Sequence, residues 1–454
     1  MTLGSSPLLA DASARASRYL DELDSRGVAP SAAAIERLAH LDEPLPATPG
    51  DPHDTLAVLD AIGSPATTAM AGKRFFGFVI GGSLPVSLAA NWLVGAWDQN
   101  SAYFRATPST AYLEQVALKW LLDILGLPPS SAGAFVTGAT VANLTALAAA
   151  RHSVLKAHGW NVEADGLFGA PTITVMVGAE VHPSVTKSLG VLGLGRNRVI
   201  QVPVDAQGRM RADLFPSISG PTIVCLQAGN VNTGASDPLL ELCDAARSQG
   251  AWVHIDGAFG LWAAASANLR PQIAGYAHAD SWATDAHKWL NVPYDSGLAF
   301  VRDETALQAA MAISADYLPT LSTKRNPSDF VPELSRRARG VEIWAVLRTL
   351  GRAGVGELID RNCRQARRFA EALSKAGCTI LNQVVLNQVL VSFGTPERTA
   401  RVIEGIQKEG TCWCGNTVWQ GNAAMRISVS SWATTDEDVE MSIDAILRIV
   451  RSTP

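Results

Sequence analysis

Lys288 lies between His287 and Trp289 in the segment TDAHKWLNVPYDSG, which carries little other charge. A poorly solvated ammonium gives up its proton more readily, and the resulting amine is a nucleophile toward an aldehyde. By itself, the residue is equally compatible with a lysine on a surface helix whose aliphatic stem is buried. The chemical interpretation therefore depends on what other residues accompany it.

Asp256 directly follows an apolar run in the segment WVHIDGAFG. The small residues Gly257 and Ala258 come next and would let a flat ring approach the backbone closely. A carboxylate at this point could hold the proton of a ring nitrogen. A helix cap or a salt bridge is an equally reasonable interpretation of the aspartate alone.

Two further strand-to-helix transitions carry polar groups. The run AFVTGATVANLTALAAAR passes through the turn Thr137–Thr140 into an Ala- and Leu-rich helix, whose free N–H groups would suit a phosphate. His182 follows the apolar run ITVMVGAE and opens another helix, where an imidazole could stack on a ring or move a proton. Capping and packing explain either feature equally well when it is taken alone.

The four features together indicate one chemistry. The turn Thr137–Thr140, His182, Asp256 and Lys288 each adjoin a predicted strand end, and ligands bind beyond the carboxyl ends of parallel strands. They would supply a phosphate anchor, a ring stack, a partner for a ring nitrogen and an aldehyde carrier. This is the set that pyridoxal 5′-phosphate (PLP) requires from a protein.

In their order and residue types, these motifs resemble those of the PLP-dependent group II amino-acid decarboxylases. This family includes aromatic amino acid, glutamate and diaminobutyrate decarboxylases. The resemblance runs from RFFGFV (74–79) through AHKWL and SRRARGVEIWAVLRTLG to MRISVSSW. It implies that Lys288 forms a Schiff base with PLP and that other residues contact the cofactor: Ala139 and Thr140 at the phosphate, His182 stacked on the ring, Asp256 and Ala258 at the pyridine, and Asp285 and His287 beside them. Asn230 stands where relatives usually have Thr and would make a further hydrogen bond.

The elements that would position these residues alternate between short β-type runs and helical segments over about residues 73–330. Such alternation predicts an α/β fold with a mostly parallel sheet. The resemblance specifies the type I, aspartate aminotransferase-like fold of PLP enzymes. We expect an N-terminal helical arm over 1–72, a large PLP-binding domain over 73–342, and a small C-terminal α+β domain over 343–454.

The resemblance favours loss of the α-carboxylate, followed by protonation of Cα by Tyr317 or His182. When the loop before SRRARG is aligned on its arginines, Phe330 is the nearest aromatic residue. If Phe330 replaces a tyrosine proton donor, oxygen could instead capture the intermediate and give an aldehyde. Carbon–carbon cleavage on the same scaffold and a non-catalytic binding role remain further alternatives.

The substrate side chain is expected to meet Phe78, Ile80 and, less directly, Trp97. The segment RFFGFVIGG resembles the one that lines the substrate pocket in relatives, and an apolar wall favours an aromatic or apolar amino acid. These residues could equally belong to an ordinary hydrophobic core. For Arg426 a structural salt bridge is favoured over a contact with the substrate carboxylate.

The composition sets limits on partners and location. The 454-residue chain is 47% hydrophobic and carries a net charge of −5, so we expect several lobes and no nucleic-acid partner. The N-terminus lacks a basic region followed by an apolar one, so no targeting signal is expected. No apolar run is long enough for a membrane span. The six cysteines are scattered, which suggests reduced thiols. We expect a cytoplasmic protein without a metal site, and the resemblance implies a homodimer with active sites at the interface.

Overall fold

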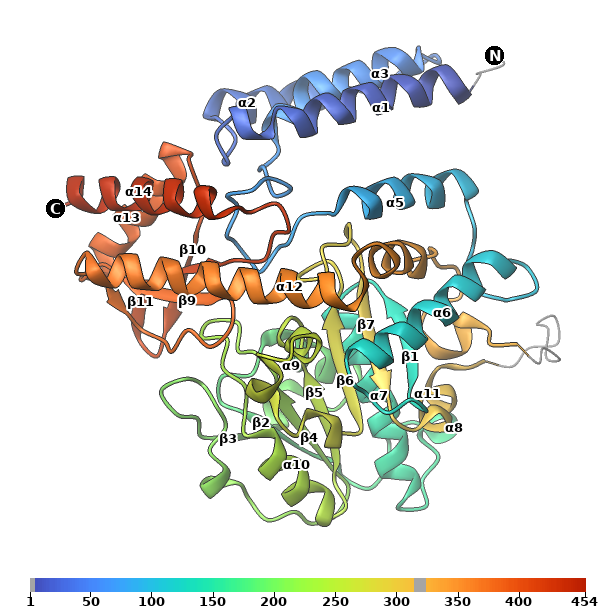
Figure 1. The fold of residues 1–454 in the computed structure, drawn as a ribbon. Helices are drawn as coiled ribbons and strands as arrows, with labels where there is room; N and C mark the ends of the chain where they lie inside the picture. The colour runs from blue at the N-terminus through green and yellow to red at the C-terminus, as the bar shows by residue number, and fades with distance from the viewer. Residues whose placement is uncertain (1–4, 314–323) are drawn as a thin grey trace. The chain divides into compact units, whose positions relative to one another are not determined.

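The computed structural model describes residues 5–313 and 324–454 and divides the chain into two compact units. The first unit combines Met1–Ile80, Arg368–Leu381 and Leu390–Pro454, and the second contains Gly81–Arg367 and Asn382–Val389. The first unit thus gathers segments from both ends of the chain (Figure 1).

The second unit is built on a seven-stranded sheet in the order β1-β7-β6-β5-β4-β2-β3. Only β7 is antiparallel to its neighbours, so the other six strands end at the same edge. This arrangement confirms the predicted α/β fold with a mostly parallel sheet. The strands are β1 (Ala132–Val136), β2 (Thr174–Gly178), β3 (Ile200–Val202), β4 (Thr222–Gln227), β5 (Trp252–Asp256), β6 (Ser281–Asp285) and β7 (Gly297–Val301).

One buried helix, α7 (Ala139–Lys156), packs against strands β4 to β7. It reads ATVANLTALAAARHSVLK, and most of its side chains are buried, because alanines let the helix lie close to the sheet. Helices α9 (Pro183–Val191) and α11 (Glu304–Met311) pack on α7, and α10 (Leu239–Ser248) packs on β5. A large hydrophobic core cluster lies between α7 and the sheet.

The remaining helices of the second unit are α5 (Pro85–Trp97), α6 (Pro108–Ile124), the short α8 (Val162–Asp165) and most of α12 (Gly340–Lys375). Helix α12 is interrupted at Gly351, whose φ of 60° favours glycine. The arginines of SRRARG are structural: buried Arg336 binds Glu114 at 2.7 Å and the carbonyl of Phe135 at 2.8 Å. These bonds of Arg336 tie the segment before α12 to α6 and β1.

The C-terminal part of the chain forms a four-stranded sheet in the order β10-β11-β9-β8, accompanied by two helices. Helix α14 begins at a capping box in which Thr435 and Asp438 satisfy each other's backbone N–H groups. The elements are β8 (Thr379–Ile380), β9 (Gln388–Ser392), α13 (Pro396–Glu409), β10 (Gly415–Trp419), β11 (Asn422–Ser428) and α14 (Asp436–Ser452).

The N-terminal segment is helical, as the amphipathic pattern predicts, with α1 (Ser5–Asp21), α2 (Ala32–Glu36), α3 (Pro52–Val58) and α4 (Ser64–Ala66). The Pro-rich segment 43–51, EPLPATPGD, interrupts the helices. Pro52 then begins α3 directly after its N-cap residue, Asp51. Within 5–313 and 324–454, no helix is both long and apolar enough to cross a bilayer.

Candidate active site

Most of the predicted cofactor residues converge on one cavity at the carboxyl edge of the large sheet. The cavity has a volume of about 320 Å³ and is bordered by the segments that follow β1, β2, β4, β5 and β6. Its lining residues are Thr137, Gly138, Ala139, Thr140, Val141, His182, Ser184, Gln227, Gly229, Val231, Asp256, Ala258, Phe259, Asp285, His287 and Lys288. Thus polar residues from several strand ends meet at one place, as the parallel topology requires.

Lys288 and two neighbours form a charged group on one side of the cavity. Its Nζ lies 2.9 Å from Asp285 Oδ2, and His287 Nε2 lies 3.5 Å from the same oxygen. Burial acts to raise the pKa of Asp285, but the Lys288 ammonium and a hydrogen bond from His287 outweigh it and hold the pKa below its ordinary value. The other oxygen, Oδ1, is buried without a hydrogen-bond partner in the described part of the chain.

The turn after β6 holds Lys288 through close backbone contacts. Asn291, with a φ of 58°, donates its backbone N–H to the Lys288 carbonyl, and the Trp289 indole donates to Asn362 Oδ1 at 3.1 Å. Gly81 packs against this turn, where a Cβ would lie 2.1 Å from the Lys288 carbonyl oxygen. A side chain at position 81 would therefore displace the segment that carries the lysine.

Asp256 is the last residue of β5, and its carboxylate is fixed by two hydrogen bonds. Oδ1 accepts the backbone N–H of Ala258 at 3.1 Å, and Oδ2 accepts from the Asn143 amide at 3.3 Å. The side chain is buried, yet it borders the cavity. It therefore presents an oriented carboxylate to any ring bound there.

The start of α7 borders the same cavity through Gly138, Ala139 and Thr140. Gly138 is the N-cap residue and makes no side-chain cap, so the first N–H groups of the helix are available to an anion. Gly297 of β7 lies directly behind the turn, where a Cβ would come within 2.4 Å of the Gly138 Cα. The turn therefore depends on glycine at position 297 of the strand behind it.

His182 caps the start of α9. Its Nδ1 accepts the backbone N–H of Ser184 at 3.2 Å, which leaves the proton of the neutral imidazole on Nε2. The ring is half-buried and borders the cavity. This geometry can support ring stacking by the imidazole and proton donation by its imidazolium form.

Asn230 does not belong to this lining. Its amide is used within the loop after β4, where Nδ2 donates to Gln227 Oε1 and Oδ1 accepts the backbone N–H groups of Asn232 and Thr233. Gln227, the last residue of β4, borders the cavity instead. The same rule that found Asp256, a polar residue ending an apolar run, could have found Gln227.

Of the residues predicted for proton transfer, His182 borders the cavity. Tyr317 is outside the described residues. Phe330 is only 1% exposed and packs in the large core cluster beneath the Arg325 guanidinium, 3.8 Å from the ring centre. The alternative in which Phe330 takes the place of a tyrosine proton donor stays a prediction.

The predicted substrate residues are divided between the two units. Ile80 lies in a small core cluster with Phe75, and Phe78 is exposed, with its ring 5.4 Å from that of Trp413, all within the first unit. Trp97 ends α5 in the second unit and is not part of the cavity lining. Their contact with substrate stays a prediction.

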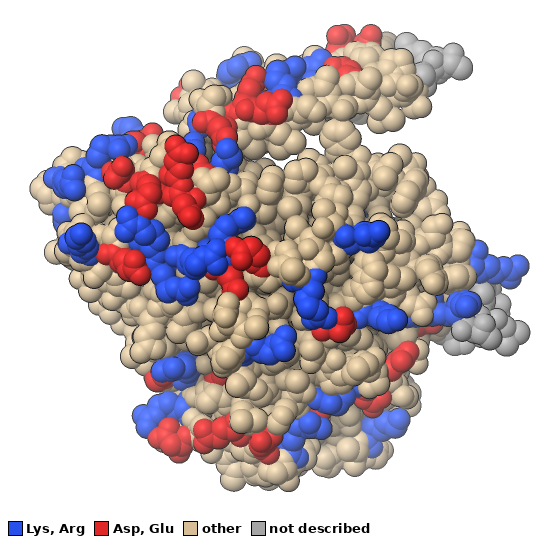
Figure 2. Space-filling model, in the orientation of Figure 1, with Lys and Arg blue, Asp and Glu red and all other residues tan. Residues whose placement is uncertain are grey.

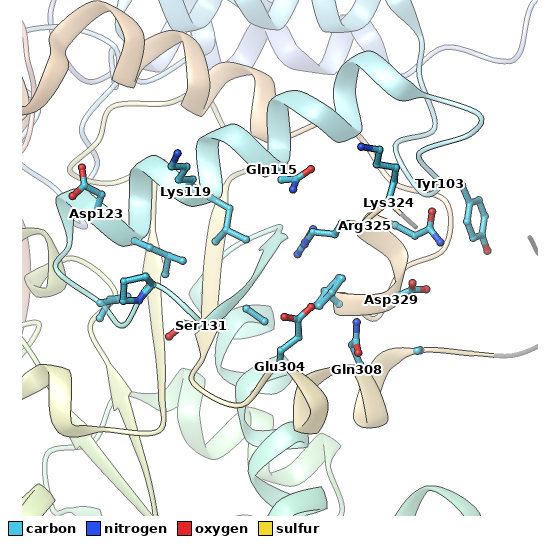
Figure 3. A pocket seen from close by; sticks show the side chains of 18 of the residues that line it. Tyr103, Gln115, Lys119, Asp123, Ser131, Glu304, Gln308, Lys324, Arg325 and Asp329 are labelled. Atoms are coloured by element: carbon cyan, nitrogen blue, oxygen red, sulfur yellow. The ribbon is translucent and has the colours of Figure 1, made fainter. Parts of the chain in front are cut away.

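A larger hollow of about 1120 Å³ lies between α6, α11 and the segment that begins at Lys324 (Figure 3). Its labelled side chains include Lys119, Glu304 and Arg325, and it contains none of the predicted cofactor residues. Arg325 donates to Glu114 and to the carbonyl of Gly133. The smaller cavity is therefore the candidate active site, because it holds the reactive groups.

Comparison with known proteins agrees with this assignment. A family model described as the pyridoxal-dependent decarboxylase conserved domain matches residues 40–395. The chain is 28% identical over 348 residues to the aromatic-L-amino-acid decarboxylase of Bacillus atrophaeus, covering 74% of this chain and 70% of that protein. It is 30% identical over 390 residues to the L-2,4-diaminobutyrate decarboxylase of Rhizobium meliloti (strain 1021), covering 79% and 74%.

The fold is also shared with a solved structure. The crystal structure of Oryza sativa TDC with PLP and tryptamine superposes with a TM-score of 0.91 at 22% identity, covering 100% of this chain and 99% of that one. This likeness confirms the fold that the motifs predict.

Proposed function

Because the chain belongs to the pyridoxal-dependent decarboxylase family, we propose that it removes the α-carboxylate of an amino acid with an aromatic or apolar side chain, using PLP carried on Lys288. The chain is a PLP-dependent carboxy-lyase; the substrate preference and the role of Lys288 are the proposed parts. The convergence of Lys288, Asp256 and His182 on one cavity carries the proposal.

The cavity's groups match those of the cofactor. The uncapped start of α7 offers N–H groups to a phosphate, and Asp256 offers a carboxylate to a pyridinium. Lys288 offers the amine, while Asp285 Oδ1 is a buried acceptor with no partner in the described part of the chain. These four features give a cradle with a cationic, an anionic and a phosphate-binding side.

Each residue would do one task. When bound, PLP supplies an electron sink that accepts the electrons released as CO₂ departs. Lys288 would bind the aldehyde carbon through Nζ, and Asp256 would hold the proton on the ring nitrogen. The ring of His182 would cover one face of the cofactor. In its imidazolium form, with Nδ1–H donating to Ser184 Oγ, it would return the Nε2 proton to Cα.

The cavity lining favours an uncharged substrate side chain. Val141, Val231 and Phe259 border the cavity, and the lining residues in the described part of the chain include no arginine that could bind an acidic side chain bidentately. The relatives are named for both an aromatic and a diamino substrate, so the preference must come from this chain's own residues.

The test is a screen of the PLP-loaded protein with the standard amino acids, ornithine, diaminobutyrate and dihydroxyphenylalanine. CO₂, amine, aldehyde and peroxide would be followed together, with the Lys288→Ala variant as the blank. We expect equal amounts of CO₂ and amine from an aromatic or apolar amino acid. CO₂ only from diaminobutyrate or an acidic amino acid would overturn the substrate preference.

The other products separate the alternatives. Aldehyde formed with oxygen uptake and peroxide would indicate an aldehyde synthase. Cleavage that keeps the α-carboxylate would indicate a carbon–carbon lyase. Absence of any product from every amino acid would contradict the proposal.

A further inference from the structure

A line of buried polar side chains extends from Asp256 into the hydrophobic layer between α7 and the sheet. Asn143 of α7, His254 of β5 and Ser281 of β6 have no exposed surface. Polar groups at such depth are destabilising unless they are hydrogen-bonded, and their combination calls for an explanation beyond packing.

The three side chains form one continuous hydrogen-bonded chain that ends on the carboxylate. The Trp252 indole donates to Ser281 Oγ at 2.9 Å, and Ser281 Oγ lies 2.9 Å from His254 Nδ1. His254 Nε2 lies 2.8 Å from Asn143 Oδ1, and Asn143 Nδ2 donates to Asp256 Oδ2 at 3.3 Å.

The carboxylate fixes the direction of every bond in this chain. Because Asp256 can only accept, Asn143 must present its NH₂ group to it and its Oδ1 to His254. His254 must then carry its proton on Nε2, so Nδ1 accepts from the Ser281 hydroxyl. That hydroxyl oxygen in turn accepts from Trp252. All donors therefore point toward Asp256.

The second N–H of Asn143 leads to the other side of the cavity. Asn143 Nδ2 donates to Ser184 Oγ at 3.3 Å, and this hydroxyl lies 2.8 Å from His182 Nδ1. One buried amide thus connects the carboxylate that faces the cavity with the imidazole that would cover the ring.

The fold explains how these residues meet. Trp252, His254 and Asp256 alternate along β5 and so point to the same face of the sheet, toward α7. In the parallel pairing of β5 and β6, His254 lies opposite Ser281. The signal in the sequence was a histidine two residues before Asp256 inside an otherwise apolar strand.

We infer that His254 and Asn143 are positioning residues that orient Asp256 toward the cofactor's ring nitrogen through a hydrogen-bonded chain ending at Ser281. This inference rests on the proposed role of Asp256. His254 touches neither the cavity nor a reacting atom, since it lies behind Asn143. Its effect must therefore depend on the ring nitrogen.

The test compares two ligands that differ only at that nitrogen: PLP and its analogue with CH in place of the ring nitrogen. Dissociation constants would be measured by titration of the wild-type protein, His254→Leu and His254→Gln. We expect His254→Leu to bind PLP about tenfold more weakly and the analogue almost as tightly as the wild-type protein does. The reason is that leucine cannot donate a hydrogen bond to Asn143, which holds the Asp256 carboxylate. Glutamine, whose Nε2 can replace the imidazole N–H, should restore most of the difference.

Ser281→Ala provides a second variant at the far end of the chain, with a smaller change in volume. It should weaken PLP binding in the same direction and by less than His254→Leu. If His254→Leu lost the same affinity for both ligands, the hydrogen-bonded side chains would have only a packing role, and the inference would be overturned. Unchanged affinity for both ligands would also overturn it. If the wild-type protein binds the two ligands alike, the proposed role of Asp256 itself fails, and the inference fails with it.

Discussion

His254 is a histidine that the fold keeps uncharged. Burial lowers its pKa to about 3, from an ordinary value of 6.5. The unfolded chain therefore binds a proton between these two values that the folded protein does not bind. By linkage, this residue lowers the stability of the fold as the pH falls through that window.

We expect the wild-type protein without cofactor to lose about 2 kcal/mol more stability than His254→Leu when the pH falls from about 7.5 to about 5. The reason is that leucine binds no proton in either state. Guanidinium unfolding at the two pH values measures this difference. Equal pH dependence of the two proteins would show that His254 takes up a proton in the folded state.

Among individual residues, those of the site that the sequence predicts are the ones that end an apolar run. Asp256 and the Thr137–Thr140 turn were found in this way, and both border the cavity. Asn143 was not found, because it lies inside a helix and its role depends on the register between helix and strand. The involvement of Asn230 within its own loop also depends on backbone geometry that composition does not reveal.

Among contacts between secondary-structure elements, the site depends most on the one between β7 and the turn after β1. Gly297 pairs with Val136 across the antiparallel β1–β7 ladder, and it lies against the backbone of Gly138. A Cβ here would be 2.4 Å from the Gly138 Cα, which is too close for any side chain.

Gly297→Ala should therefore displace the start of α7 and weaken PLP binding by about tenfold or more, because N–H groups that bind a phosphate must be placed precisely. The dissociation constant for PLP, measured by absorbance titration, tests this. Gly50→Ala is the matched control, since a Cβ at position 50 meets no atom within 4 Å. Unchanged affinity in Gly297→Ala would contradict the assignment of the turn as phosphate site.

Most strands of the large sheet were predictable from short apolar runs, because the parallel strands are buried on both faces. Strand β6 lacks such an apolar run: it reads SWATD, and all five residues are buried. Its polar side chains are accommodated by partners such as Trp252, which lie far away in the sequence. The reversed direction of β7 likewise follows from tertiary pairing.

At the scale of the whole molecule, α5 presents an apolar surface to solvent. Trp92, Leu93 and Trp97 of this helix are all exposed. Exposed apolar residues that gather on one helix favour an association surface, and a second copy of the chain is the partner that the family resemblance implies. In contrast, acidic and basic side chains are intermingled on the face shown in Figure 2.

We expect the protein to sediment as a homodimer and Leu93→Glu to shift it toward monomer with loss of activity, because a buried unpaired carboxylate destabilises an interface. Sedimentation velocity and the CO₂ assay would be run on the same samples. Val418→Glu introduces the same charge at another exposed apolar residue and should remain dimeric. A wild-type monomer with full activity would refute the dimer.

The association of both chain ends in the first unit is not visible in the sequence. Within that unit, Arg74 binds Asp438 at 3.0 Å and the carbonyl of Thr411 at 2.8 Å, although several hundred residues separate them along the chain. Such pairs follow from the folded topology, whereas the domain boundaries expected from the sequence rest on local patterns. The expected boundaries at residues 72 and 342 stay a prediction.

The central claim is that Lys288 carries the cofactor. Borohydride reduction of the PLP-loaded protein converts a Schiff base into a stable secondary amine, and peptide mass spectrometry then locates it. We predict that the label lies on Lys288 and that Lys288→Ala, which keeps the rest of the cavity, shows neither label nor the visible absorption of the bound aldehyde. A label on another lysine, or a Lys288→Ala variant that retains both, would contradict the account.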